Sequence, residues 1–218
     1  MDVSRGRLLA WTSLVAVLTA LNYASRLAEG KPPDDTLYRY DYALGGAVQY
    51  ALILAVVLWI ARGLPKRRLL ALRRPRSWPS AAGLALLVLL AIALVSAALN
   101  PVLHPGQEQG LTPNRWESSH AVAYGLNFAV IAGVAPVVEE LTFRGLGFTL
   151  LERFGVPSAI LLVGLAFGLA HGLIEALPIL IVFGSGLAYL RSRTESVYPG
   201  MLLHGTFNAI ALTLAVTT

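Results

Sequence analysis

Seven long apolar runs, separated by short polar segments, dominate the pattern of this chain. The runs cover residues 8–23, 42–60, 81–99, 121–151, 158–173, 176–190 and 201–216. Segments of about 17–25 mostly apolar residues are long enough to cross a bilayer as helices. The pattern therefore predicts an all-α, polytopic membrane bundle of seven helices, in which the sixth is short.

Composition supports a membrane protein. Of the 218 residues, 56% are hydrophobic and 13% are charged, whereas soluble domains carry about 25% charged residues. The first three runs contain no acidic or basic residue. We therefore expect one integral membrane domain over 1–218, with N-terminal spans and a basic loop in 1–114 and a catalytic core in 115–212. The chain has no cysteine, which excludes disulfides and cysteine nucleophiles.

Basic residues are distributed unevenly along the predicted topology. The segment 61–79 carries seven of them and no acid, so the positive-inside rule places this loop and the N-terminus in the cytoplasm. Twelve of the 17 basic residues then lie on the inner side and four on the outer side, and Arg144 lies within the membrane. The net charge of +5 thus indicates orientation in the lipid bilayer, and no nucleic-acid partner is expected.

The stretch EELTFRG, residues 139–145, places charges inside the fourth apolar run, where burial of a charge costs free energy. Glu140 and Arg144 are four residues apart, so they share a helix face and can form an ion pair. On a helix of 3.6 residues per turn, Glu139 points about 100° away from that pair. Glu139 is therefore the carboxylate available for chemistry.

Two further polar motifs lie in the later runs. In FGLAHGL, Phe167 and His171 are one helical turn apart, so the aromatic ring can pack beside the imidazole and orient it. In HGTFN, His204 and Asn208 share a helix face and can direct hydrogen-bond donors to one point. At a rise of about 1.5 Å per residue, three helices bring Glu139, His171 and His204 to the middle of the bilayer.

Each motif also has a purely structural interpretation. Glu140 and Arg144 can be a pair that only satisfies two buried charges, and a single membrane histidine can simply bond one helix to another. Glu175, four residues after His171, is a candidate partner for that imidazole. Structural pairing does not explain why a carboxylate, two imidazoles and an amide converge, and this convergence favours a reaction site.

The order of the motifs resembles a known family. The pattern E-E-x-x-x-R, then F-x-x-x-H, then H-x-x-x-N on successive membrane helices is similar to the CAAX prenyl protease and bacteriocin-processing (CPBP, Abi) family, relatives of the type II CAAX endopeptidases. The resemblance covers roughly residues 115–212. It implies an intramembrane metalloendopeptidase built as a bundle of about seven to eight transmembrane helices around a polar cavity that opens to the cytosol.

The resemblance also implies roles for individual residues. The catalytic residues would be Glu139, Glu140, His171, His204 and Asn208, and the structural or orienting residues would be Arg144 and Phe167. Glu139 and His171 would activate the attacking water. His204 and Asn208 would stabilise the oxyanion.

Two mechanisms fit these residues. Glu139, His171 and His204 can form a His₂Glu set suited to Zn²⁺, with an open fourth position. The sequence contains no HExxH motif, however, and the same groups can run a metal-free glutamate and histidine mechanism.

Several functions are compatible with the sequence. The expected protein is a multi-pass peptidase of the cell membrane, whose substrate is a peptide or protein with a membrane-embedded or lipidated segment. A prenylated CAAX tail is the best-known substrate of the family that it resembles. The alternatives are a non-catalytic membrane scaffold or bacteriocin-immunity protein of the same fold, and a transporter, since intramembrane Glu, Arg and His also form proton relays.

Overall fold

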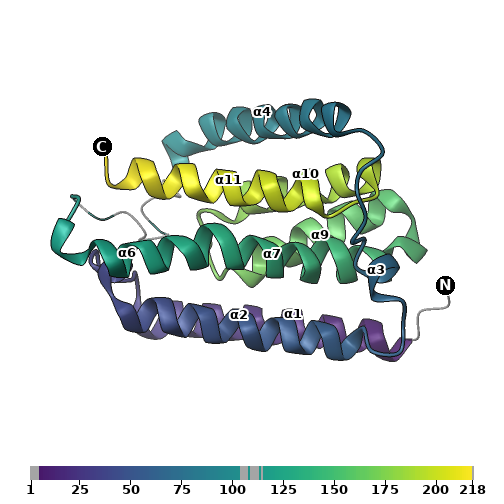
Figure 1. The fold of residues 1–218 in the computed structure, drawn as a ribbon, viewed down its shortest axis with the longest axis horizontal. Helices are drawn as coiled ribbons and strands as arrows, with labels where there is room; N and C mark the ends of the chain where they lie inside the picture. Colours follow the sequence, from purple (N-terminus) through teal and green to yellow (C-terminus); the bar gives the residue numbers. More distant parts are fainter. Residues whose placement is uncertain (1–4, 104–107, 109–112, 114, 218) are drawn as a thin grey trace.

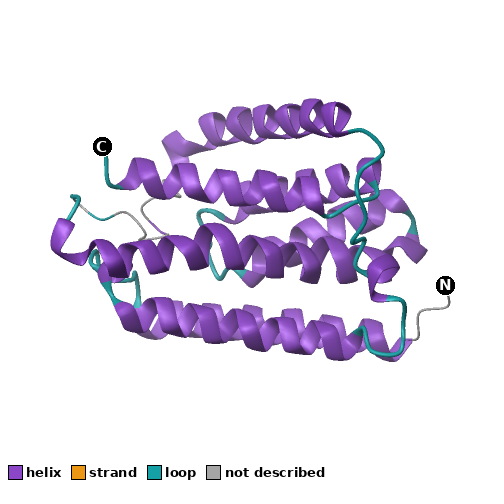
Figure 2. Cartoon of the chain, viewed as in Figure 1, coloured by secondary structure: helices purple, strands orange, loops and turns teal. Residues whose placement is uncertain are grey.

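The protein is described by a computed structural model that covers residues 5–103, 108, 113 and 115–217. Within these residues all regular structure is helical, as the apolar runs predict (Figure 2). Outside the central segment described below, the described residues form six long helices: α1 (Arg5–Glu29), α2 (Tyr40–Ile60), α4 (Trp78–Leu103), α9 (Val156–Ala170), α10 (Leu177–Thr194) and α11 (Tyr198–Ala215). Two short helices, η1 (Thr36–Tyr38) and α3 (Lys66–Leu69), lie in connections.

The fourth apolar run forms one long helical segment, Ser118–Phe154. It is built from η2 (Ser118–His120), α6 (Ala121–Phe128), η3 (Ala129–Val134), α7 (Ala135–Glu139), η4 (Glu140–Gly147), α8 (Phe148–Leu151) and η5 (Glu152–Phe154). Both η3 and η4 are π-helical. The assumption of 3.6 residues per turn is therefore wrong over the motif itself, because a π-helix bonds i to i+5 and is wound more widely.

The helices run roughly parallel to one long direction of the molecule (Figure 1). Helices α1 and α2 form one side, α4 forms the opposite side, and the Ser118–Phe154 segment lies between them with α9, α10 and α11. Helices α9 and α10 pack closely where two glycines meet, since a Cβ added to Gly184 would lie 2.9 Å from the Cα of Gly164. Small residues let membrane helices approach in this way.

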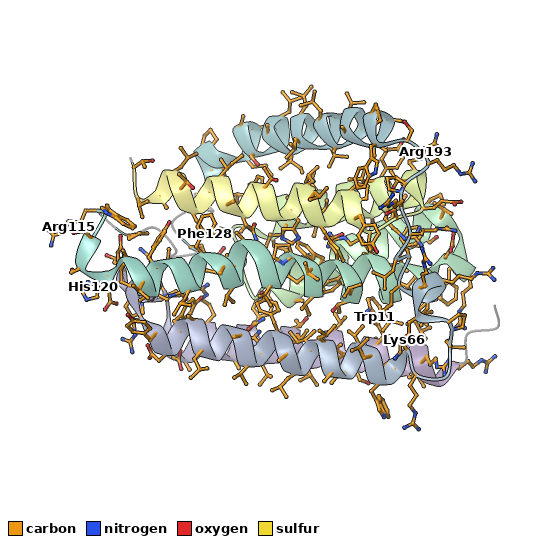
Figure 3. The ribbon with its side chains drawn as sticks, in the orientation of Figure 1. Trp11, Lys66, Arg115, His120, Phe128 and Arg193 are labelled. Carbon is orange, nitrogen blue, oxygen red and sulfur yellow. The ribbon has the colours of Figure 1, made fainter. Side chains whose placement is uncertain are left out.

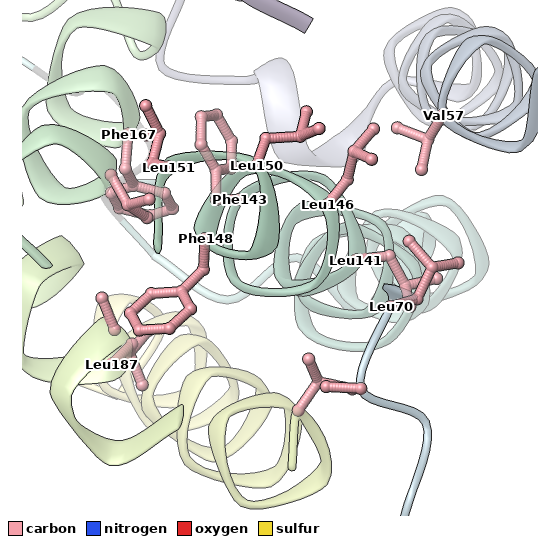
Figure 4. Packing of buried hydrophobic residues seen from close by; sticks show 14 of the residues in the cluster. Val57, Leu70, Leu141, Phe143, Leu146, Phe148, Leu150, Leu151, Phe167 and Leu187 are labelled. Carbon is pink, nitrogen blue, oxygen red and sulfur yellow. The ribbon is translucent and has the colours of Figure 1, made fainter. Parts of the chain in front are cut away.

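The core is centred on η4 and α8 (Figure 4). All eight residues of η4 are buried. Phe148 and Phe167 are the largest fully buried apolar side chains, and Leu146, Leu150 and Leu187 pack with them. The segment that carries the EELTFRG motif is therefore enclosed by other helices.

The outer surface of the bundle is apolar. Leu21, Leu52 and Leu86, from α1, α2 and α4, are 61%, 63% and 68% exposed. Four helical segments are long and apolar enough to cross a membrane: Arg5–Glu29, Tyr40–Ile60, Trp78–Leu99 and Ser118–Phe154. The chain is thus a multi-pass membrane protein. Helices α9, α10 and α11, of 15 to 18 residues, are not among these four segments, so the total of seven to eight spans stays a prediction.

Charged side chains gather at the two ends of the bundle (Figure 3). Lys66 and Arg193 lie at the end where α1 begins, and Arg115 and His120 lie at the other. One end of the helical bundle is therefore mainly basic, and the other end carries both acidic and basic side chains.

Candidate active site

The ion pair expected from the four-residue spacing is present. Arg144 Nη1 donates to Glu140 Oε1 at 2.9 Å, and both side chains are fully buried. Arg144 Nη2 also donates to the carbonyl of Gly184 at 3.0 Å, and its Cζ lies 4.3 Å from the centre of the Phe167 ring. The guanidinium therefore joins η4 to both α9 and α10.

Glu139, the last residue of α7, has a different environment from its neighbour. Its Oε1 accepts a hydrogen bond of 2.7 Å from the Tyr50 hydroxyl. Its Oε2 is buried and has no hydrogen-bond partner among the described residues. One carboxylate oxygen is thus held in place, while the other is available.

The sequence motifs do not predict a role for Tyr50. It lies on α2, far from the three motifs in sequence. One signal was available, since Gln49 and Tyr50 are the hydrogen-bonding side chains farthest from the ends of the run 42–60. A polar group at the centre of an apolar span needs a partner, but the sequence does not name that partner.

Two imidazoles face the free oxygen of Glu139. The Nε2 atoms of His171 and His204 lie 4.0 Å and 3.7 Å from Glu139 Oε2. His171 Nδ1 lies 2.7 Å from the carbonyl oxygen of Phe167, and His204 Nδ1 lies 3.3 Å from Glu140 Oε1. Both of these oxygens accept, so each Nδ1 donates, and each ring directs its Nε2 toward Glu139.

His171 lies at the end of a helix. The predicted run to residue 173 is too long, because α9 ends at Ala170 and His171 is its C-cap. Gly172 follows with φ of 66°, and a Cβ there would lie 2.7 Å from Asn22 on α1. Asn22 Nδ2 donates to the Ala170 carbonyl at 2.6 Å. Helix α1 thus fixes the turn that holds the imidazole.

Of the other predicted residues, Phe167 and Asn208 lie close to this cluster, whereas Glu175 does not. The Phe167 ring lies 4.4 Å from the His171 ring, centre to centre. Asn208 lines the same pocket as His204, and its Nδ2 donates to the Ile131 carbonyl at 2.9 Å. Glu175 is exposed in the turn after α9, and no hydrogen bond joins it to His171 within the described chain.

A pocket of about 850 Å³ leads to these groups. The catalytic candidates that line it are Glu139, His171, His204 and Asn208, together with Tyr50. Phe183 and Phe207 form an aromatic wall, because their ring centres are 5.1 Å apart and Phe183 lies 5.1 Å from the His204 ring.

Charged residues line the mouth of the pocket: Arg26, Glu29, Lys31, Arg39 and Asp41. Arg39 Nη2 donates to Asp41 Oδ2 at 2.7 Å, and this hydrogen bond raises the pKa of the Arg39 guanidinium above its usual value. Lys31 pairs with Asp34 at 3.4 Å. The mouth therefore carries both signs of charge.

The donor atoms suit a zinc ion chemically, but their spacing is wide. Tetrahedral ligands at zinc bond lengths of about 2.0–2.1 Å lie roughly 3.4 Å from one another. The two imidazole nitrogens are 3.7 and 4.0 Å from Glu139 Oε2. As they stand, the described residues contain no group of three or more His, Asp or Glu side chains arranged for a metal ion. The unpartnered Glu139 Oε2 nevertheless faces two imidazole nitrogens, and all three atoms are of the kinds that bind zinc.

The comparison with protein families agrees with the motif order. Residues 120–210 match the family model of Type II CAAX prenyl endopeptidase Rce1-like proteins. No curated protein and no solved structure matches the chain. The matched segment contains every predicted site residue, from Glu139 to Asn208. The resemblance to the CAAX prenyl endopeptidases that the motif order predicts is therefore confirmed over residues 120–210, the segment that matches the Type II CAAX prenyl endopeptidase Rce1-like family.

Proposed function

We propose that the protein is an intramembrane endopeptidase that hydrolyses a peptide bond with a water molecule activated by Glu139. One observation carries the proposal. The buried, unpartnered Oε2 of Glu139 faces the Nε2 atoms of His171 and His204 at the floor of a pocket. The family of residues 120–210 supports the same reaction class.

The first step of the proposed mechanism is attack by water. Glu139 Oε2 takes a proton from the water as its oxygen bonds to the substrate carbonyl carbon. Tyr50 holds the other carboxylate oxygen, and His171 Nε2 accepts a hydrogen bond from the same water. The proton on Glu139 then passes to the leaving nitrogen as the C–N bond breaks.

The carbonyl oxygen becomes an oxyanion during attack and needs donors. Asn208 has a second amide hydrogen besides the one given to Ile131. His204 donates from Nε2 when that nitrogen is protonated, while Glu140 holds its Nδ1. Glu140 thus acts through His204 and Arg144, and we assign it a positioning role.

Zinc would be held by Glu139, His171 and His204. When bound, it would supply a Lewis acid that polarises the carbonyl and lowers the pKa of a bound water to about 7.

The test is cleavage of a diverse peptide pool by the purified protein in detergent. Glu139→Gln is expected to lower turnover by about 10²- to 10⁴-fold, because it removes the base and keeps the shape. Glu175→Gln is the matched control, since Glu175 is an exposed acid outside the cluster. Equal activity of wild type and Glu139→Gln would overturn the role of Glu139 as the base. No cleavage by either would overturn the peptidase function and favour a non-catalytic membrane protein.

A further inference from the structure

Among the described residues, the charged mouth of the pocket lies at one end of the bundle. Its mouth residues come from the end of α1, the connection after it and the start of α2, with Glu29, Lys31 and Asp41 all exposed. Gln49, one turn deeper than Gly45 on α2, is also exposed and lines the pocket. An open path thus runs along α2 from that end toward Tyr50 and Glu139.

The other end of the bundle is closed below the site. The chain continues from Glu139 into η4 and α8, where Leu146 and Leu150 are 0% and 1% exposed. Leu69 and Leu70, from the basic segment 61–79, are 0% and 1% exposed and belong to the same core. Figure 4 shows Leu70 packed in this core. Packed side chains therefore separate the carboxylate from the basic end.

The position of the pocket mouth is incompatible with two expectations from the sequence taken together. The positive-inside rule places segment 61–79 in the cytoplasm, and the family resemblance implies a cavity that opens to the cytosol. Lys66 lies at the end where α1 begins (Figure 3). The mouth residues come from the end of α1 and the start of α2, which is the opposite end of the bundle. Both expectations cannot hold, and the twelve-to-four asymmetry of basic residues supports the first.

We propose that substrate reaches Glu139 from the non-cytoplasmic face of the membrane, so that the substrate class is a polypeptide whose cleaved segment lies on that face. This inference rests on the proposed peptidase function. A lipidated tail made and kept in the cytosol would then not reach the site.

The lining suggests which segment fits. Ile179, Leu180 and Phe207 line the pocket, and Phe207, which is 41% exposed, lies one turn after His204 on α11. The mouth above them is charged and hydrophilic. The substrate segment therefore carries apolar side chains next to the cleaved bond and a polar part in the mouth.

Single cysteines test the direction of access, because the parent chain contains none. The probes are Gln49→Cys inside the pocket, Ser119→Cys at the same end outside it, and Ser77→Cys at the basic end. A membrane-impermeant maleimide is added to spheroplasts that express the full chain, before and after permeabilisation. We expect the cysteines at 49 and 119 to react in intact spheroplasts, and the cysteine at 77 only after permeabilisation.

The same probes test the substrate class. In a Glu139→Gln background, a peptide with apolar residues around one bond is expected to slow labelling at position 49 but not at position 119. A uniformly charged peptide of equal length is the control. Equal protection by both peptides would overturn the proposed apolar preference.

Two labelling results would overturn the access route. One is reaction at position 77 but not at position 49 in intact spheroplasts. The other is reaction at position 119 while position 49 stays unlabelled, which would mean that the outer end is closed. Labelling does not depend on catalytic turnover, so the two hypotheses can fail separately. If the pocket is labelled from outside but no peptide is cleaved, the peptidase function alone is rejected. If peptides are cleaved but the pocket is reached from the cytoplasm, the proposed access route alone is rejected.

Discussion

Two adjacent glutamates have different surroundings. Glu140 is fully buried and contacts both Arg144 and His204, whereas Glu139 contacts Tyr50 and keeps one oxygen free. Truncating one member of a buried ion pair leaves the other charge unsatisfied. The two carboxylates should therefore respond differently to the same substitution.

Glu140→Gln is expected to destabilise the protein by about 1–3 kcal/mol or more, because Arg144 would be left buried without its counter-charge. Glu139→Gln should leave the midpoint of thermal unfolding nearly unchanged. Unfolding in detergent, followed by circular dichroism, measures both. If the two variants show the same stability and the same activity, this division of roles is wrong.

Tyr50→Phe is expected to lower kcat about tenfold with little change in KM, since partners that orient a reacting group typically contribute this much. Loss of one hydrogen bond should cost the fold only about 1 kcal/mol. Tyr189→Phe, at an exposed tyrosine outside the pocket, is the matched control. If Tyr50→Phe and Tyr189→Phe lower activity by the same factor and lower stability by the same amount, a positioning role for Tyr50 is rejected.

Zinc content is a separate prediction. Protein purified without a polyhistidine tag should carry about one zinc per chain, and His171→Ala with His204→Ala should remove it, because a His₂Glu site needs both imidazoles. Elemental analysis measures the metal. Active wild-type protein with far less than one metal per chain would instead support the metal-free glutamate and histidine mechanism.

At the scale of elements, the close contact of α9 and α10 carries the site. Helix α9 supplies Phe167 and ends at Ala170, with His171 as its C-cap, and the Gly184 carbonyl of α10 accepts from Arg144. The two helices meet at Gly164 and Gly184 with no room for a side chain. Their separation therefore sets the position of the first imidazole relative to Glu139.

Gly184→Ala is expected to destabilise the fold by about 1–3 kcal/mol, because a Cβ must push α9 and α10 apart. Gly83→Ala is the control, since a Cβ at Gly83 on α4 meets nothing within 4 Å. That change should be neutral or stabilise by up to about 1 kcal/mol through helix propensity. Thermal unfolding of the two variants should therefore shift in opposite directions or by clearly different amounts, and equal shifts would contradict the packing argument.

At the scale of the whole molecule, the ends of the described chain lie at opposite ends of the bundle. Helix α1 begins at the basic end, and α11 finishes at the end that carries Arg115 (Figures 1 and 3). If every long helix crosses the membrane, this arrangement requires an odd number of spans.

Cysteines at Gly6 and Thr217 are therefore expected to lie on opposite sides of the membrane. An impermeant maleimide should label Thr217→Cys in intact spheroplasts and Gly6→Cys only after permeabilisation, because the basic end faces the cytoplasm. Labelling of both from the same side would indicate an even number of spans and would reject the seven-helix topology.

Hydropathy and motif spacing determined the all-helical class, the approximate helix positions and the Glu140–Arg144 pair. These are local properties, since each membrane helix satisfies its backbone hydrogen bonds within itself and an i,i+4 pair needs no second helix. The motif residues were identifiable because charge inside an apolar run is costly.

Tertiary structure alone decided the rest. The π-helical backbone of Glu140–Gly147 depends on the helices that enclose it, and the end of α9 at Ala170 depends on Asn22 of α1. Tyr50 and Glu139 are 89 residues apart and meet only when α2 packs beside α7. The direction in which the pocket opens is also decided by tertiary structure. It depends on the end of the bundle at which separate helices leave space between them, and no local sequence pattern encodes the spacing of separate helices.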